Sequence, residues 1–415
     1  MGTPSLEQLD IIGNDEYARA GYPHEAWAIL RREAPVYWYE RPGVEPPFWA
    51  ITKHADVVAI SRRPELFRNA PRLAVFPDFP ARDPESEPPA RHLLNMDPPD
   101  HAEFRRVASH RFTPRALRAL HGDIDEITRE TLDAVATRGE LVEIDFVERV
   151  AARIPLAVLA DMLGVPRVDW ELMFRWTNET IGATDPEYQQ GTAQETAARS
   201  RNALFGYFMR MAEERRTRPS DDVVSVIANG RVGGKQLPPF ELLSYFYLIV
   251  IAGNETTRNA TSGGLLAFIE NPGELEKLRR NPGLIDSAVE EIVRWTSPVI
   301  QFCRTATEDT ELRGQKIRAG ESLCLFYPSA NRDEDVFDEP FRFRIDRQPN
   351  EHIGFGRGEH VCLGAHLARL ELRCAFAQLR ERLQHVELAG APERVRSSFV
   401  GGIKRVPIRW RLAPA

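Results

Sequence analysis

Apolar residues along most of the chain recur at spacings of three and four, which is the period of an amphipathic helix. This pattern predicts two helical regions, residues 100–298 and 363–385. Shorter stretches that are rich in aromatic and β-branched residues and bounded by Pro and Gly are typical of strands. They predict small β regions at about residues 30–70, 299–345 and 390–412. We therefore expect a mainly α-helical protein with small β regions, of the α+β class.

Two of the predicted β regions have the pattern of a hairpin. The first turns at residues 41–46, and the second occupies residues 397–412 near the C-terminus. Residues 71–100, by contrast, contain many prolines and few periodic apolar positions, and they predict a long irregular loop. No Gly/Ser-rich or charged linker divides the chain, so we expect one domain over residues 1–415.

The composition is that of an ordinary globular protein. The chain has 415 residues, 42% of them hydrophobic, which is enough to bury a large core. A net charge of −7 argues against a general affinity for nucleic acid or an anionic membrane. The four cysteines are widely spaced, unlike a disulfide scaffold, and neither an export signal nor a long apolar run is visible. We expect a cytoplasmic monomer without a membrane anchor.

A single cysteine stands in a glycine-rich segment just before the second helical region. Glycines at 354, 356, 358 and 364 allow a tight turn and close approach to a flat ligand. Cys362 falls near the start of the helix, where the helix dipole and free N–H groups stabilise a thiolate that can ligate a haem iron. The alternatives are an inert buried cysteine, or a zinc site that would need clustered ligands which the chain lacks.

The helix predicted over residues 239–270 is apolar almost all round in its first half and polar in the middle, at residues 253–257. Leu248, Ala252 and Thr256 share one face, where small residues leave room for a ligand. A threonine hydroxyl can bond back to the carbonyl four residues earlier, and the neighbouring Glu255 can act as a proton donor. The alternative is a kinked helix with solvent-facing polar residues.

Both segments resemble the cytochrome P450 family. The pattern F-G-x-G-x-H-x-C-x-G is matched by Phe355, Gly356, Gly358, His360, Cys362 and Gly364, and the pattern A-G-x-[D/E]-T-T is matched by residues 252–257. The resemblance implies the cytochrome P450 fold and haem b as cofactor, with Cys362 as the axial ligand of the iron. It places Phe355 beside the sulfur and Gly356, Ala252 and Gly253 beside the haem, and it implies that Glu255 and Thr256 supply protons during oxygen activation.

Further positions match other patterns of the family. Glu291 and Arg294 match E-x-x-R, and Arg342 matches the later P-x-R-F, which implies a structural triad. His101 and Arg105 match D-P-P-x-H-x-x-x-R, and Arg304 matches the arginine of the following strand. Together with His360, these three residues are implied to bind the haem propionates, because carboxylates need cationic or hydrogen-bonding partners.

The implied activity is that of a monooxygenase, which inserts one atom of O2 into a C–H or C=C bond. Electrons would come from NAD(P)H through ferredoxin reductase and ferredoxin, the latter docking on the basic residues Arg105, Arg106, Arg111 and Arg115. A peroxide-driven peroxygenase and a haem-thiolate sensor or binding protein are the alternatives. We expect an apolar substrate, a steroid or sterol, a terpenoid or a branched lipid. Its pocket is predicted from the segments 71–95 and 170–200 and from Leu248, Ile251, Ala252, Val299, Ile300, Phe399 and Val400.

Overall fold

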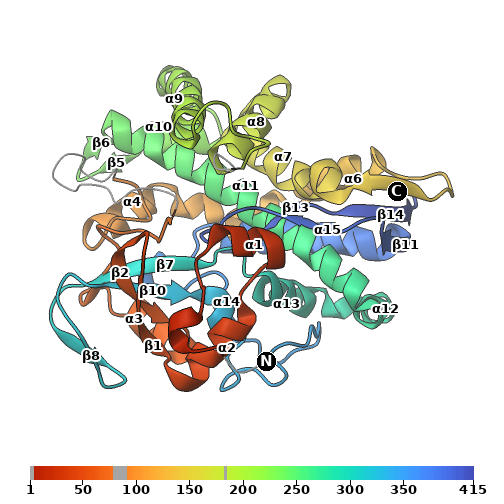
Figure 1. Cartoon of the computed structure of the whole chain (residues 1–415). Helices are drawn as coiled ribbons and strands as arrows, with labels where there is room; N and C mark the ends of the chain where they lie inside the picture. Colours follow the sequence, from red (N-terminus) through yellow and green to blue (C-terminus); the bar gives the residue numbers. More distant parts are fainter. Residues whose placement is uncertain (1–3, 78–90, 182–184) are drawn as a thin grey trace.

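Helices dominate the computed structural model, which describes residues 4–77, 91–181 and 185–415. The mainly α-helical fold with small sheets that the sequence predicted is therefore confirmed (Figure 1). The α-helices are α1 (Asn14–Ala20), α2 (His24–Glu33), α3 (His54–Ser61), α4 (Asp100–Ser109), α5 (Pro114–Ala119), α6 (His121–Asp133), α7 (Arg153–Leu163), α8 (Trp170–Ile181), α9 (Ala193–Thr217), α10 (Val223–Ala228), α11 (Pro239–Glu270), α12 (Pro272–Arg280), α13 (Ile285–Thr296), α14 (Tyr327–Ala330) and α15 (Ala365–Arg382).

The largest sheet is five-stranded, with the order β1-β2-β10-β7-β3. Its strands are β1 (Val36–Arg41), β2 (Val44–Ile51), β3 (Phe67–Arg68), β7 (Gln301–Ala306) and β10 (Ser322–Phe326). The first predicted hairpin is present as the antiparallel pair β1–β2, in which Trp38 lies opposite Trp49. β2 and β10 run parallel, and this pairing joins the N-terminal part of the chain to a segment some 270 residues later. The short pairs β5 (Arg231–Val232) with β6 (Lys235–Gln236), and β8 (Thr310–Leu312) with β9 (Gln315–Ile317), stand apart from it.

The predicted C-terminal hairpin is wrong. β13 (Ile403–Arg405) pairs with β12 (Glu393–Arg394), whereas β14 (Pro407–Leu412) lies between β11 (Leu383–Leu388) and β4 (Val142–Asp145). Only Val406 separates β13 from β14, too few residues for a hairpin turn of its own. The predicted loop at 71–100 has no helix or strand at 71–77 or 91–99, and its residues 78–90 lie outside the described part.

Helix α11 crosses the molecule, and α7, α8, α9, α13 and α15 pack against it (Figure 1). Its largest buried side chains, Phe246 and Phe268, belong to the main hydrophobic cluster. Phe246 stacks on Phe208 of α9, and Phe268 packs on Phe376 of α15. A helix packed on several sides explains why its sequence is apolar almost all round. Among the described residues, none of the helices combines the length and the apolar character that a membrane span requires.

The segment before α15 makes a close approach to α3. Gly356 and Gly358 have φ angles of 72° and 73°, a left-handed conformation that glycine adopts without strain. A Cβ atom on Gly358 would lie 2.0 Å from the carbonyl oxygen of Ser61, the last residue of α3. Glycine at 358 is therefore required both by backbone conformation and by this contact.

A buried ionic cluster braces the same region, and it corrects one predicted residue. Arg294 donates to Glu291 through Nε and Nη2, at 2.7 and 2.8 Å, and both side chains are completely buried. The third member is Arg347, whose Nε lies 3.1 Å from Glu291 Oε2. Arg342, which the sequence pattern suggested, pairs with Glu339 at the surface and contributes only its backbone carbonyl to Arg294 and Arg347.

Candidate active site

A strip of accessible residues interrupts the buried surface of α11. Ala252 is exposed, and Leu248, Ile251 and Thr256 are half-buried, while the residues around them are mostly buried. Leu248, Ala252 and Thr256 follow at intervals of four and so share one face. This strip is therefore the part of α11 that a small ligand can reach.

The Thr256 hydroxyl lies on this accessible face. It donates a hydrogen bond to the carbonyl oxygen of Ala252 at 2.8 Å, as the spacing of four predicted. Gly253 was expected beside the haem but faces α7 instead, because a Cβ atom there would lie 3.3 Å from Leu159 of that helix. The small residue at 253 thus permits contact between α7 and α11 rather than opening room on the Thr256 face.

Cys362 faces a second accessible patch, three residues before α15 begins. Its backbone N–H donates to the Phe355 carbonyl at 2.9 Å, which closes the glycine-rich turn. The cysteine has exposed surface, yet desolvation by the surrounding protein raises the pKa of the thiol. Exposure without access to bulk water is what a side chain at the wall of an internal space would show. The flanking Phe355 and Leu363 pack on the same hydrophobic cluster as Leu248 and Ile251, so both patches border one core.

Four predicted residues converge beside this patch. The imidazoles of His101 and His360 lie with ring centroids 3.9 Å apart. Burial first, and then the nearby His101, Arg304 and Arg105, lower the pKa of His360 to about 2. Burial and Arg105 lower the pKa of His101 to about 4. Both rings are therefore neutral near pH 7, in a place that repels further positive charge.

The donors of this cluster fit an anionic ligand. Both nitrogens of His101 and Nε2 of His360 are buried and have no hydrogen-bond partner among the described residues. Buried polar atoms are rarely left unpaired. Arg304 donates to the Cys303 carbonyl and Arg105 to the Val361 carbonyl. Both acceptors are uncharged, so neither guanidinium charge is neutralised by its hydrogen bond. Carboxylates would accept from an N–H of each imidazole and pair with both guanidinium groups, and the cluster therefore fits the propionates of the haem that the cysteine segment implies.

Glu255 is held by residues that the sequence patterns did not suggest. The carboxylate is buried and accepts hydrogen bonds at Oε1 from Arg258, in an ion pair one turn along α11, and from Asn259 at 3.2 Å. Arg258 also donates to Asn178 of α8 at 3.0 Å. Oε2 has no partner among the described residues. The spacing of three between Glu255 and Arg258 could have indicated this pair, whereas the contact with Asn178 depends on the tertiary fold.

Of the further residues predicted to line a substrate pocket, Val299, Phe399 and Val400 keep accessible surface, whereas Ile300 does not. Val299 and Val400 face each other in an isolated β-bridge and are half-buried. Phe399 packs edge-on against Phe302 and Phe76. Ile300 is a correction, because it is completely buried in the N-terminal cluster with Trp27, on the other side of the extended chain from Val299. Of the predicted segments 71–95 and 170–200, residues 78–90 and 182–184 lie outside the described part.

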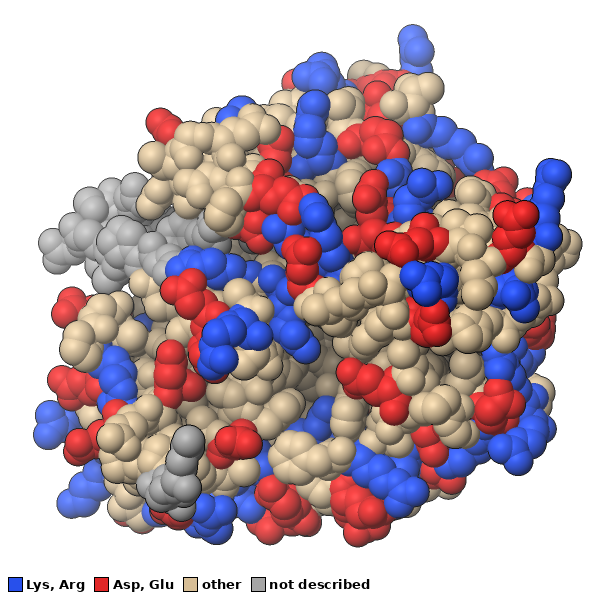
Figure 2. Space-filling view, turned by 45° about the vertical axis from the view of Figure 1, so that its right-hand side comes forward, with Lys and Arg blue, Asp and Glu red and all other residues tan. Residues whose placement is uncertain are grey.

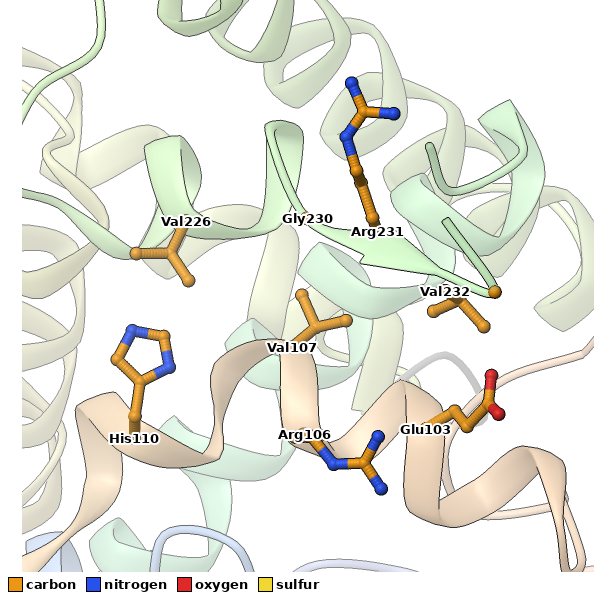
Figure 3. A pocket seen from close by; sticks show the side chains of 9 residues that line it. Glu103, Arg106, Val107, His110, Val226, Gly230, Arg231 and Val232 are labelled. Carbon is orange, nitrogen blue, oxygen red and sulfur yellow. The ribbon is translucent and has the colours of Figure 1, made fainter. Parts of the chain in front are cut away.

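A separate hollow of about 450 Å³ opens between α4, α10 and β5 (Figure 3). Val107, Val226 and Val232 form its apolar part. Gly230 permits the close approach, because a Cβ atom there would lie 2.5 Å from a methyl group of Val107. The charged residues around the hollow have both signs, and none of them belongs to the clusters around Cys362 or Thr256; they are Glu103, Arg106 and Arg231.

Comparison with known proteins identifies the class. Residues 184–401 match the family model of cytochrome P450. The chain therefore belongs to the cytochrome P450 family and is a haem-containing monooxygenase, whose cofactor is haem b. Proteins of this kind receive their electrons from redox partners.

Individual relatives cover nearly the whole chain. The steroid C26-monooxygenase of Mycolicibacterium smegmatis is 38% identical over 92% of this chain and 89% of its own. The methyl-branched lipid omega-hydroxylase of Mycobacterium tuberculosis is 37% identical over 98% of this chain and 94% of its own. Among solved structures, a Mycobacterium marinum cytochrome P450 in complex with pseudoionone has a TM-score of 0.89 at 35% identity, covering 98% of this chain and 100% of the other.

Proposed function

We propose that this enzyme oxidises an apolar small molecule with a branched aliphatic chain, either a steroid or sterol side chain, a terpenoid or a methyl-branched lipid. The observation that carries the proposal is the accessible strip of α11, where Leu248, Ile251 and Ala252 offer only apolar surface beside the Thr256 hydroxyl. An apolar surface with one polar group binds a hydrocarbon, and the orientation of the hydrocarbon is then determined by the shape of the pocket.

The names of the relatives support this substrate class. One acts at C26 of a steroid and another at the omega carbon of a methyl-branched lipid. Both positions lie toward the end of a branched aliphatic chain. The half-buried Val299, Val400 and Phe399 add apolar surface of the kind that such a chain would contact.

The cysteine segment and the four-residue cluster hold the haem in this proposal. Cys362 ligates the iron through its thiolate, and His101, Arg105, Arg304 and His360 bind the propionates. When bound, the haem supplies the activation of dioxygen and the oxidation of the substrate. The protein's part is to hold both ends of the cofactor and to keep bulk water away from the thiolate, as the raised pKa of the Cys362 thiol reflects.

Thr256 and Glu255 handle protons. The Thr256 hydroxyl can rotate away from the Ala252 carbonyl and offer its proton at the accessible face. Glu255 replenishes that proton by relaying one from solvent. Its Oε1 is occupied by Arg258 and Asn259, so the free Oε2 is the oxygen available for exchange. A positioned acid of this kind contributes roughly 10²–10⁴-fold to a proton transfer.

Electrons come from NAD(P)H through ferredoxin reductase and ferredoxin. Arg106 and Arg115 are exposed and form no ion pair in the described ranges, whereas Arg111 pairs with Asp221. Arg105 donates to the carbonyl of Val361, the residue before Cys362, so α4 adjoins the cysteine segment. An acidic ferredoxin docked on α4 would therefore lie close to the cysteine side of the haem. With four free cysteines, the protein is proposed to work as a monomer in the reducing cytoplasm.

A spectral titration of the ferric enzyme tests the substrate class. The panel contains a steroid with its branched side chain, the same ring system without that chain, a methyl-branched fatty acid and its linear counterpart. We expect the low-spin to high-spin change with the two branched compounds and a weaker response to their controls. Equal responses to all four compounds, or a response to the ring system alone, would contradict the proposed substrate class.

The alternative of a peroxide-driven peroxygenase is tested with the best ligand from that titration. We expect product with ferredoxin, its reductase and NADH, and much less with hydrogen peroxide at equal enzyme. Product with peroxide alone would favour the peroxygenase. An absence of product in both assays, with normal ligand binding, would favour the sensor or binding protein.

A further inference from the structure

An ion pair joins α13 to α15 directly behind the cysteine segment. Arg369 donates to both oxygens of Glu290, with Nε–Oε1 at 2.6 Å and Nη2–Oε2 at 2.9 Å. The two side chains are 29% and 30% exposed, so the pair is partly shielded from solvent. A bidentate pair with this geometry holds both groups in fixed positions.

His352 ties this pair to the start of the cysteine segment. Its Nδ1 accepts a hydrogen bond from the backbone N–H of Gly354 at 3.2 Å. The ring proton therefore lies on Nε2, which donates to Glu290 Oε2 at 2.9 Å. The imidazole is neutral in this arrangement. The group of three, Glu290, His352 and Arg369, thus contains one negative and one positive charge.

Arg369 contacts the residue that is hydrogen-bonded to the cysteine. The Arg369 guanidinium lies 4.4 Å from the centroid of the Phe355 ring, and the Phe355 carbonyl accepts the Cys362 N–H. Besides Arg105, which donates to the Val361 carbonyl from α4, Arg369 is the cation whose charge acts on the Cys362 sulfur. A charge held at a fixed distance from the sulfur must affect every equilibrium that changes the charge of the site.

We propose that Glu290 and Arg369 form a positioning pair that sets the electrostatic potential at the Cys362 thiolate and thereby the reduction potential of the haem. The proposal rests on Cys362 being the iron ligand. It differs from the role of the buried Glu291–Arg294–Arg347 cluster, which braces the fold, because it assigns opposite electrostatic effects to the two partners.

The signs of the two effects make the proposal testable. Glu290→Gln leaves the Arg369 charge unopposed, which favours the reduced state and shifts the midpoint potential to a more positive value. Arg369→Gln leaves the Glu290 charge unopposed and shifts the potential to a more negative value. The double variant removes both charges and is expected to return close to the wild type. Arg369→Lys keeps the charge and should restore most of the wild-type potential.

The same two helices provide a matched control. One turn later in α15 and one turn earlier in α13, Arg373 pairs with Asp286, with Nε–Oδ1 at 2.6 Å, and these side chains are 40% and 71% exposed. Asp286→Asn and Arg373→Gln remove the same charges from the same helix contact at a more exposed place. We expect them to shift the midpoint potential much less than the variants at 290 and 369.

The measurement is spectroelectrochemical titration of the purified enzyme, with haem content and the ferrous–CO spectrum recorded for every variant. Suppose that the wild type has the CO spectrum of a thiolate-ligated haem. The proposal is then overturned if the midpoint potentials of Glu290→Gln and Arg369→Gln shift with the same sign, or by no more than those of the controls. A wild type without that spectrum would instead refute Cys362 as the ligand, and the proposal with it. If one single variant fails to fold, the sign of the other, measured against the double variant, still decides the question.

Discussion

The Thr256 hydroxyl is the one side-chain donor in the accessible strip of α11, among Leu248, Ile251 and Ala252. Thr256→Ala removes it without changing the helix backbone. We expect NADH consumption to continue while the yield of product per NADH falls by about tenfold or more, because proton delivery becomes non-productive. Thr256→Ser should recover most of the coupling. Product formation and NADH oxidation are measured together, and unchanged coupling in Thr256→Ala would contradict the proposed role.

Acid stability gives a second test at the residue scale. Burial alone would raise the pKa of Glu290, but hydrogen bonds from His352 and Arg369 lower it from its ordinary value of 4.5 to about 2. A carboxyl with a lowered pKa stabilises the folded state fully above pH 4.5, and this contribution disappears as the pH falls toward 2. The unfolding free energy of wild type should therefore exceed that of Glu290→Gln by a few kcal/mol at most at pH 7, and the difference should shrink below pH 4.5. Urea unfolding at several pH values measures it, and a difference independent of pH would contradict this explanation.

Sequence spacing could indicate only part of the site. The resemblance to the family selected His101, Arg105, Arg304 and His360, which the structure brings together. It missed the partners of Glu255 and the Glu290–His352–Arg369 group, because those contacts join elements far apart in the chain. Arg342 was predicted and Arg347 was missed, because a short pattern in an irregular segment does not reveal which side chain points inward.

At the scale of elements, α13 and the segment after residue 340 are joined by the Glu291–Arg294–Arg347 cluster. Arg347→Ala would leave part of the buried Glu291 charge unpaired, and breaking such a pair costs about 3–5 kcal/mol. Arg342→Ala removes only an exposed pair with Glu339, and we expect less than about 1 kcal/mol. Urea unfolding and haem content distinguish the two variants. A larger loss of unfolding free energy in Arg342→Ala than in Arg347→Ala would instead support Arg342, which the sequence pattern suggested, as the third member of the cluster.

Helices were easier to predict than strand partners. The period of three and four is local, so α11 and α15 were visible in the sequence close to their observed bounds. Strand pairing depends on partners elsewhere in the chain. β14 lies beside β4, about 265 residues earlier, and no local pattern could indicate this neighbour. The predicted hairpin at 397–412 failed for that reason.

At the scale of the whole molecule, acidic residues outnumber basic ones, 61 against 54. The net charge is −7, and Figure 2 shows acidic and basic side chains interspersed over the face in view. A redox partner would therefore be guided by a few exposed residues rather than by the overall field. Ion pairing within the molecule reduces the available positive charge further, since Arg111 pairs with Asp221. Arg106 of α4 and Arg115 of α5 are exposed and form no ion pair in the described ranges, so their charges remain available to a partner.

Docking on Arg106 and Arg115 predicts a particular dependence on salt. Replacing both with Gln should lower the second-order rate of reduction by ferredoxin several-fold at low ionic strength, because steering by exposed charge is lost. The difference should fade as added salt shortens the Debye length to about 3 Å at 1 M. Arg138→Gln is the control, because Arg138 is exposed and forms no ion pair in the described ranges. It follows Thr137, which bonds the end of β14 at the opposite end of the molecule from α4 (Figure 1). Stopped-flow reduction under CO measures the rates. If Arg138→Gln slowed reduction as much as the double variant, net charge rather than a docking face on α4 and α5 would control the encounter.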